Sequence, residues 1–238
     1  MISDAMTEML RLVHTQPRRP LADRCAAVLG VDHLAISLVV EGEATEQLWS
    51  SGEPSSLFED LQFTLGEGPG PDALSSGSLI LHHDMRLVPS ERWPALLPAM
   101  EELPVRAVFC FPLCLGGIIV GVLTLVRAVP GPMSNQEMDD ALALAEALTF
   151  QFLGGEGEPQ DFFTDAPAAS MHRAVVHQAT GMISVQLGLA LGPALLRLRA
   201  HAFSHNQPIN EIAREVVARR LRLPDVASGP DSPNGKKG

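Results

Sequence analysis

The sequence lacks the features that mark membrane and secreted proteins. No apolar run among its 238 residues approaches the ~20 residues that a membrane-spanning helix needs. Residues 1–11 mix Asp4 and Glu8 with apolar side chains, and they have neither the basic start nor the long apolar stretch of a signal peptide. Both absences predict a cytoplasmic protein that does not bind membranes.

Cysteine is scarce, and its placement does not indicate disulfide bonds. The three cysteines are Cys25, Cys110 and Cys114. Cys110 and Cys114 fall in one expected strand, where four residues span roughly 13 Å, whereas a disulfide needs Cα atoms within about 7 Å. Reduced thiols fit a cytosolic protein. These two residues are candidates for oxidant sensing, but Arg106 is the only basic residue near them in sequence, so we favour apolar packing.

The sequence also lacks the patterns of common enzyme sites. It contains no nucleophile-elbow, kinase or zinc-hydrolase motif. Residues 66–71 are rich in glycine and proline, but they lack P-loop spacing and a following Lys-Ser/Thr, so we expect a structural loop. His82 and His83 are adjacent on an expected strand and point to opposite faces, which disfavours a shared metal ion. We therefore predict no catalytic residues, no metal site and no cofactor.

Acidic residues dominate the first part of the chain and basic residues the last part. Residues 1–165 carry 8 Arg and 24 Asp or Glu, a net charge of −16, whereas residues 166–238 carry 9 Lys or Arg and 4 Asp or Glu, a net charge of +5. This asymmetry indicates that only the C-terminal part meets a polyanion. The alternative is that the acidity serves solubility and the basic end is a solvated helix face.

Helical and strand patterns alternate in the first part of the chain. Alternating apolar residues over 34–40 predict a half-buried strand. The clearest hairpin consists of two apolar runs, 105–115 and 118–127, around Gly116-Gly117. Further expected elements are a helix over 21–30, a turn at 41–43, a return strand over 45–50, a short strand over 78–82 and a helix over 91–103.

A long helix closes this part. Ser134 and Glu137 have capping-box spacing, and the helix that they open is expected to run to about residue 153. Its apolar positions recur in steps of three and four, which suits either coiled-coil pairing or packing on the domain's own sheet. We favour a homodimer. The apolar positions include Met138, Ala141, Leu142, Ala145, Leu148 and Phe152.

After about residue 170 the pattern is purely helical. The first helix is expected over 171–187, with a stripe of Arg173, His177, Thr180 and Ser184 that can touch a phosphate backbone. Gly181 in mid-helix costs about 1 kcal/mol relative to alanine, and it permits close approach of a partner helix or of RNA.

Two further helices are expected. The second begins near Pro193 and the third near Pro208. The third helix is expected to bury one face as far as Leu221 and to pair Glu215 with Arg219. Its basic last turn, with Arg219, Arg220 and Arg222, suits either the helix dipole or RNA contact.

Three short patterns recur in these helices: Gln178-Ala179-x-Gly181-Met182, Leu198-Arg199-x-x-Ala202 and Ile212-Ala213-x-x-Val216-Val217. In these patterns residues 172–223 resemble the ANTAR family of RNA-binding antiterminator domains. The resemblance implies a three-helix domain that binds RNA hairpins in nascent transcripts. It implies Gly181 and Arg199 as RNA-binding residues, to which the helical stripe adds Arg173, His177 and Thr180.

Two positions depart from the ANTAR pattern. The family usually has a lysine where this chain has Thr180 and a basic residue near Gln186. Because phosphate contacts dominate nucleic-acid affinity, the loss of two cations predicts RNA binding that is weaker, altered or lost.

The first part of the chain contains a second set of short patterns: Leu65-Gly66-Glu67-Gly68-Pro69, Asp72-Ala73, Phe111-Pro112-Leu113, Gly121-Val122-Leu123 and Pro132-Met133-Ser134. In these patterns residues 18–153 resemble a GAF domain of the kind that precedes ANTAR domains in actinobacterial regulators. The resemblance implies a central antiparallel sheet with flanking helices and, in many members, a small ligand in a pocket on one side of that sheet.

The predicted organisation is an α+β GAF-like domain over 1–153, a linker over 154–169, an all-α three-helix ANTAR-like RNA-binding domain over 170–223 and a disordered tail over 224–238. We predict a signal-responsive RNA-binding regulator of transcription antitermination that is not an enzyme. One alternative is a ligand- or redox-sensing module that acts through protein partners and carries a degenerate RNA-binding tail. The other is a DNA-binding helix-turn-helix, although no helix start clusters base-reading Asn, Gln or Arg.

Overall fold

The chain divides into two compact units, Met1–Arg173 and Ala174–Gly238. The computed structural model describes residues 1–13, 18–40, 44–154, 168–205 and 207–224. The expected turn at 41–43 lies outside the described residues, as do nearly all of the expected linker over 154–169 and the expected tail over 224–238.

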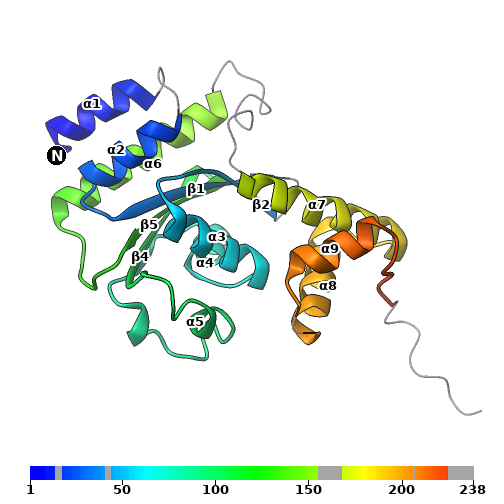
Figure 1. The fold of residues 1–238 in the computed structure, drawn as a ribbon. Helices are drawn as coiled ribbons and strands as arrows, with labels where there is room; N and C mark the ends of the chain where they lie inside the picture. Colours follow the sequence, from blue (N-terminus) through cyan, green and yellow to red (C-terminus); the bar gives the residue numbers. More distant parts are fainter. Residues whose placement is uncertain (14–17, 41–43, 155–167, 206, 225–238) are drawn as a thin grey trace, which may run out of the picture. The chain divides into compact units, whose positions relative to one another are not determined.

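The first unit is built on a five-stranded antiparallel sheet with the strand order β2-β1-β5-β4-β3 (Figure 1). β4 and β5 pair around Gly116, whose φ of 61° suits a tight hairpin turn. The expected strands are confirmed. Their bounds are β1 (His33–Val40), β2 (Ala44–Ser50), β3 (Ile80–His82), β4 (Ala107–Leu115) and β5 (Ile118–Arg127).

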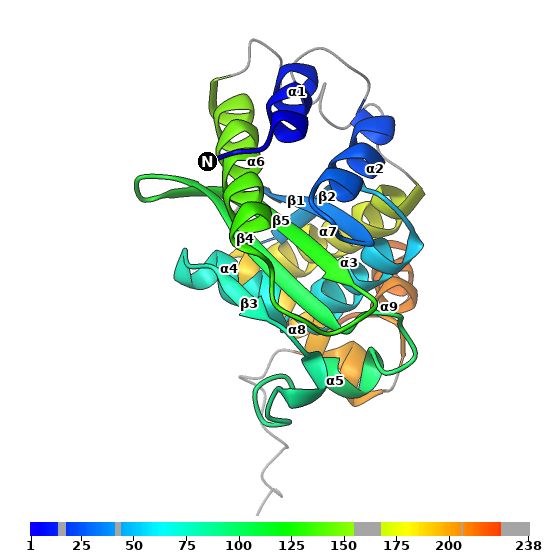
Figure 2. The same cartoon turned by 90° about the vertical axis from the view of Figure 1, so that its left-hand side faces the viewer.

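Helices cover both faces of the sheet, and each face has its own apolar core (Figure 2). One face packs against α1 (Asp4–Val13), α2 (Arg18–Val28) and α6 (Asn135–Gly154). The other face packs against α3 (Glu53–Leu65), α4 (Pro69–Ser76), the 3₁₀ helix η1 (Met85–Leu87) and α5 (Leu96–Ala99). Neighbouring strand residues therefore serve different cores: Phe109 belongs to the first and Cys110 to the second.

The start of α6 is held by the expected capping box. The backbone N–H of Ser134 donates to Glu137 Oε2 at 2.6 Å, and the N–H of Glu137 donates to Ser134 Oγ at 3.2 Å. Arg127, the last residue of β5, donates to Glu137 Oε1 at 2.7 Å and to the carbonyl oxygen of Gly30 at 3.1 Å. These bonds join the beginning of α6 to the end of β5 and to the turn after α2.

The apolar seam expected on α6 is used mainly inside the first unit. Ala141, Ala145 and Leu148 are buried in the core between α6 and the sheet. Leu142, which the sequence pattern placed in the seam, is instead 42% exposed. It faces outward with Phe150 and Leu153, which are 53% and 40% exposed. Packing on the domain's own sheet therefore accounts for the seam, and the outward stripe is a separate apolar surface.

Two expectations about local structure are wrong. A helix forms only over Leu96–Ala99 in place of 91–103, because Pro94 and Pro98 interrupt the backbone hydrogen bonds that a longer helix requires. The Gly/Pro-rich segment 66–71 is not wholly a loop, since α4 begins at Pro69, where proline suits the first helical turn. The sequence patterns also missed α1 and α3.

Candidate nucleic-acid interface

Three helices form the second unit. α7 (Ala168–Leu187) enters it at Ala174, and α8 (Leu191–Ser204) and α9 (Ile209–Val217) follow. The apolar face expected for each helix is buried, which confirms the three-helix fold. The buried residues are Val176, Ala179 and Ile183 on α7; Ala194, Leu195, Leu198 and Ala202 on α8; and Ile209, Ile212, Ala213 and Val216 on α9.

The third helix ends earlier than the sequence pattern suggests. Arg219 has a φ of 59°, and its N–H donates to the carbonyl oxygen of Val216 at 2.9 Å. The N–H of Arg220 donates to the carbonyl oxygen of Glu215, also at 2.9 Å, which completes a Schellman motif. Because Arg219 leaves the helix, the expected pairing with Glu215 is wrong: Arg220 binds that carboxylate with two hydrogen bonds of 2.8 and 2.9 Å.

The predicted RNA-binding residues of α7 differ in exposure. His177 is half-buried, whereas Thr180 is only 4% exposed and its hydroxyl donates to the carbonyl oxygen of Val176 at 2.8 Å. At Gly181, a Cβ would meet no other described atom within 4 Å. No neighbouring helix within the described part of this chain therefore explains this glycine, and the space beside it is open.

Arg173 lies in the first unit and has an internal role there. Its Nη2 and Nε donate to Asp60 Oδ1 at 2.8 and 3.1 Å, and its Nη1 donates to the carbonyl oxygen of Thr45 at 3.4 Å. The guanidinium carbon lies 4.8 Å from the ring centroid of Phe63. With 2% exposure, this arginine is neutralised and covered rather than offered to solvent.

The positions at which the ANTAR pattern usually carries cations have structural contacts instead. Thr180 is buried, as described above. Gln186 Nε2 donates to the carbonyl oxygen of Leu223 at 2.8 Å and so ties α7 to the segment after α9. Ser184 Oγ donates to the carbonyl oxygen of Leu189 at 2.6 Å, which closes the turn between α7 and α8.

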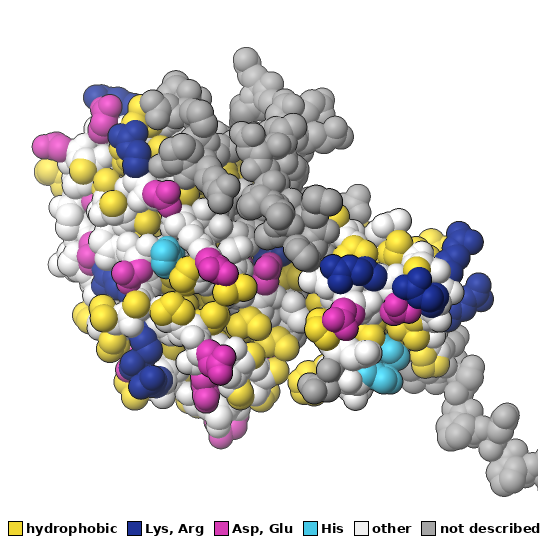
Figure 3. All heavy atoms as spheres, viewed as in Figure 1, with side chains coloured by type: hydrophobic (Ala, Val, Ile, Leu, Met, Phe, Trp, Pro, Cys, Tyr) yellow, Lys and Arg dark blue, Asp and Glu magenta, His cyan; other side chains and the backbone are white. Residues whose placement is uncertain are grey.

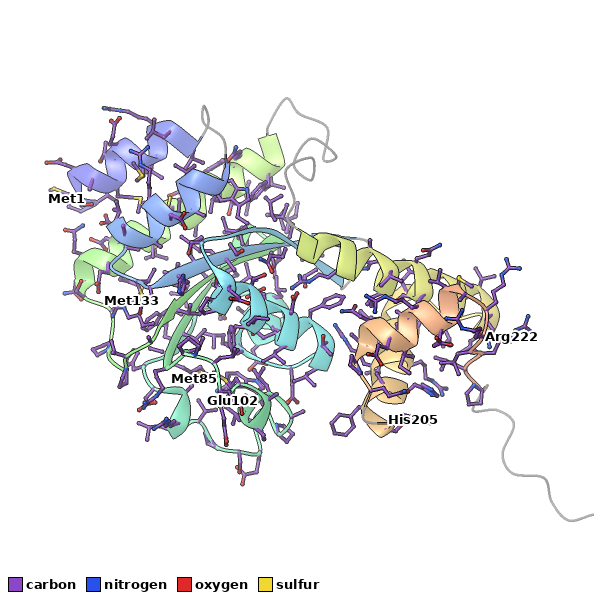
Figure 4. All side chains as sticks on the ribbon, in the orientation of Figure 1. Met1, Met85, Glu102, Met133, His205 and Arg222 are labelled. Carbon is purple, nitrogen blue, oxygen red and sulfur yellow. The ribbon has the colours of Figure 1, made fainter. Side chains whose placement is uncertain are left out.

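Exposed arginines gather around α9 and the segment that follows it. Figure 3 shows arginine side chains on this part of the second unit, and Figure 4 places Arg222 beyond the end of α9. Among the described residues of the second unit, the arginines with exposed side chains are Arg214, Arg219, Arg220 and Arg222. Arg199 on α8, the remaining predicted contact residue, is half-buried.

The end of α8 carries an aromatic group that the sequence analysis did not single out. Phe203 is 72% exposed, and the rings of His201 and His205 stack with centroids 4.0 Å apart. Partial burial lowers the pKa of His201, and the charge of the neighbouring His205 adds to this effect. Helical spacing could have predicted this exposure, because Phe203 does not lie on the apolar face formed by Leu195, Leu198 and Ala202.

The described residues offer little for other kinds of site. Among the described residues, no group of three or more His, Cys, Asp or Glu is arranged to hold a metal ion. In the same part of the chain, no single helix has the length and apolar character to cross a membrane; residues 173–187 and 191–204 pass that test only as a pair, bent by 107°.

The first unit is similar to several solved structures. The GAF domain of an Acinetobacter phosphoenolpyruvate-protein phosphotransferase matches with a TM-score of 0.50 and 16% identity, covering 66% of this chain and 96% of that one. The corresponding GAF domain from Coxiella burnetii gives 0.49 and 19%, covering 63% and 95%. The free methionine-R-sulfoxide reductase of Neisseria meningitidis gives 0.48 and 14%, covering 63% and 87%.

Family models identify both parts of the chain. The comparison with curated proteins finds none that matches. The model of the GAF domain matches residues 19–152, and the model of the ANTAR domain matches residues 164–217. The first match covers more than half of the 238 residues, and the second covers the three helices as far as the end of α9. The chain therefore belongs to the GAF domain family and carries an ANTAR domain behind its GAF domain.

Proposed function

We propose that this protein is a signal-responsive regulator of transcription antitermination, in which the ANTAR domain binds RNA hairpins in nascent transcripts and the GAF domain senses the signal. The observation that carries the proposal is the exposed arginine group around α9, within a C-terminal part whose net charge is +5. Arginine is well suited to phosphate, because its planar guanidinium donates two parallel hydrogen bonds. The protein is not an enzyme in this proposal, and it works in the cytoplasm, where nascent bacterial transcripts are made.

The exposed arginines compensate for the cations that α7 lacks. Each arginine that meets a phosphate releases condensed counterions, and this release supplies much of the affinity for nucleic acids. Arg214, Arg219 and Arg222 provide such charges from α9 and its C-terminal extension. The departures at Thr180 and Gln186 would therefore move the phosphate contacts towards α9 rather than abolish them.

The first unit would supply the sensor. A polar chain is buried between α3, α4 and the sheet: Ser37 Oγ donates to Glu59 Oε2 at 2.6 Å, and Gln62 Nε2 donates to Glu59 Oε1 at 3.0 Å. In the same layer, Trp93 Nε1 is buried without a hydrogen-bond partner among the described residues. Buried polar groups in an otherwise apolar layer can orient a small ligand, and a ligand that accepted from Trp93 would satisfy its N–H.

A homodimer is part of the proposal. Tandem RNA hairpins present two similar sites, which a protein with two ANTAR domains can bind together. The outward stripe of α6, formed by Leu142, Phe150 and Leu153, offers an apolar surface for pairing two chains. Replacing Phe150 with glutamate should then shift the protein towards a monomer in analytical ultracentrifugation.

A gel-shift competition tests the proposed function. The full-length protein is mixed with a labelled tandem RNA hairpin that has six-nucleotide loops, and unlabelled hairpin or duplex DNA of equal charge competes. We expect the hairpin to compete at much lower concentration, and Arg214→Ala and Arg222→Ala to weaken binding. Equal competition by DNA would favour the helix-turn-helix alternative, and no binding by a folded protein would favour a sensor that acts through protein partners.

A further inference from the structure

Arg173 is a buried cation whose counterion is a single carboxylate. It is 2% exposed, whereas every other arginine whose side chain the structure describes is at least partly exposed. Asp60 Oδ1 accepts two of its hydrogen bonds, at 2.8 and 3.1 Å, and the ring of Phe63 covers the guanidinium at 4.8 Å. A buried charge is stable only while its counterion is in place, so loss of the carboxylate favours exit of the guanidinium into water.

The place of Arg173 in the chain gives this ion pair a wider role. Arg173 is the last residue of the first unit and Ala174 is the first residue of the second, and both belong to α7. Helical spacing puts Arg173 on the α7 stripe that can touch a phosphate backbone. Arginine binds carboxylates and phosphates with the same N–H groups. Asp60 therefore holds a guanidinium that is otherwise suited to RNA.

The helix α3 connects this ion pair to the buried polar chain of the sensor layer. Asp60 follows Glu59 directly on α3, and Gln62 lies one turn further along. Glu59 Oε2 accepts from Ser37 Oγ on β1 at 2.6 Å, and Gln62 Oε1 accepts from the N–H of Gly70 in α4 at 2.8 Å. A ligand that changes these bonds would shift α3, and Asp60 would move with it.

We propose that Asp60 and Arg173 form a latch that regulates RNA binding. While the latch is closed, the carboxylate withholds Arg173 from RNA; a signal that moves α3 opens the latch and frees the guanidinium for a phosphate. This inference rests on the proposed function and names the regulation of its RNA-binding site. The Asp60 side chain is 37% exposed, so water reaches one side of the pair and the two groups can separate without unfolding the core.

The test opens the latch by substitution in the full-length protein. Asp60→Ala removes the counterion, and alanine is the best helix former, so α3 should persist. Asp72→Ala is the matched control, because Asp72 is 36% exposed and also pairs with an arginine, Arg92, at 2.9 Å. Asp60→Asn keeps an acceptor but loses the charge. The double variant Asp60→Ala/Arg173→Ala opens the latch without supplying a cation.

RNA binding is measured with a labelled tandem hairpin that has six-nucleotide loops. Asp60→Ala should bind more tightly than the wild type, because the freed Arg173 adds one phosphate contact. One contact steepens the dependence of log K on log salt by about 0.7–0.9, so this advantage should be about threefold larger at ~50 mM than at ~200 mM salt. Asp60→Asn should show a smaller gain, the double variant should lose the gain, and Asp72→Ala should bind as the wild type does.

Hydrogen exchange detects the opening without RNA. Mass spectrometry follows the backbone amides of α7 that adjoin Arg173 in the free proteins. Exchange there should be faster in Asp60→Ala than in the wild type, because the ion pair no longer fixes this part of the helix. Asp72→Ala should leave it unchanged. Equal exchange in Asp60→Ala and the wild type would show that Asp60 does not hold α7, and this would overturn the latch.

The outcomes separate the latch from the function on which it rests. If Asp60→Ala exchanges faster but keeps the affinity and salt dependence of the wild type, the ion pair is only a structural tie and the proposed function stands. Weaker binding by a folded Asp60→Ala, or an equal gain in Asp72→Ala, would also overturn the latch. If only Asp60→Ala binds the hairpin, both proposals are supported. If neither it nor the wild type binds, the proposed function fails and the regulation fails with it.

Discussion

Gln186 and Leu223 are joined by a 2.8 Å hydrogen bond from the side-chain amide to the backbone carbonyl oxygen. This bond ties the end of α7 to the segment beyond α9, at a position where ANTAR domains usually have a nearby cation. The residue that replaces the cation thus contributes to the packing of the second unit. It also marks the place where a positive charge can be restored with little disturbance.

Gln186→Lys should strengthen RNA binding. A lysine ammonium can still donate to the carbonyl oxygen of Leu223, and it adds one charge near the phosphates. One further phosphate contact should steepen the dependence of log K on log salt by about 0.7–0.9. Filter binding at several salt concentrations measures this slope. Gln207→Lys, the same change at another exposed glutamine, is the control, and equal effects of both variants would mean that only net charge matters.

Arg219→Gly should stabilise the second unit. Arg219 has a φ of 59°, a conformation that glycine adopts without the steric cost paid by other residues. We expect a gain of about 1 kcal/mol in the free energy of unfolding, measured by urea denaturation. Ala218→Gly, at a neighbour with helical φ and ψ, should instead lower stability. If Arg219→Gly instead lowers the free energy of unfolding, the contacts of the arginine side chain stabilise the unit by more than its left-handed backbone conformation costs.

Glu137→Gln should destabilise the first unit in a pH-dependent way. Burial opposes ionisation of Glu137, but the N–H of Ser134 and the guanidinium of Arg127 outweigh it and hold the pKa of the carboxyl below its ordinary value. A carboxyl whose folded pKa is depressed stabilises the protein above its unfolded pKa of about 4.3, and this contribution is lost as the pH falls through the folded value.

The wild type should therefore exceed Glu137→Gln in stability by up to about 1 kcal/mol at pH 7, because glutamine can keep the capping-box acceptor but loses the charge that pairs with Arg127. The gap should shrink as the pH falls below about 4. Thermal unfolding of both proteins across this range measures it. A gap that stayed constant with pH would mean that the charge of Glu137 has no part in its effect.

The three cysteines should differ sharply in reactivity. Burial raises the pKa of Cys25 to about 11, although Arg24 opposes the shift, and burial also raises the pKa of Cys110, with Glu59 adding to it. Cys114 is exposed at the β4–β5 hairpin. A disulfide exchange reagent at pH 8 should modify Cys114 alone in the native protein and all three thiols in denaturant. If the reagent modifies Cys110 rapidly in the native protein, the hypothesis that Cys110 senses oxidants would be favoured over apolar packing.

Strongly periodic segments could be predicted from the sequence, whereas isolated contacts could not. The β4–β5 hairpin and the capping box of α6 depend on neighbouring residues, so their local patterns were sufficient. The helix over 91–103 failed because Pro94 and Pro98 limit it to Leu96–Ala99. Residues far apart in sequence determine the contacts of Arg173, whose partner Asp60 no periodicity could have indicated.

In the candidate interface, too, local sequence patterns predicted some features and missed others. Helical spacing placed Arg199 and Gly181 correctly on their helices, but it could not show that Thr180 is buried or that Arg219 ends α9. The end of α9 depends on a left-handed arginine, a conformation that sequence rules assign to glycine. Phe203 was overlooked because an apolar residue on a helix is normally assigned to the core.

The salt dependence of RNA binding by the full-length protein tests the central claim most directly. With about four arginines on phosphates, affinity for a tandem hairpin with six-nucleotide loops should fall roughly a hundredfold between about 50 and 200 mM salt. Arg199→Ala should weaken binding at both concentrations. Submicromolar binding at the lower salt with this dependence is the predicted result. A folded protein that binds no hairpin at either concentration would contradict the account.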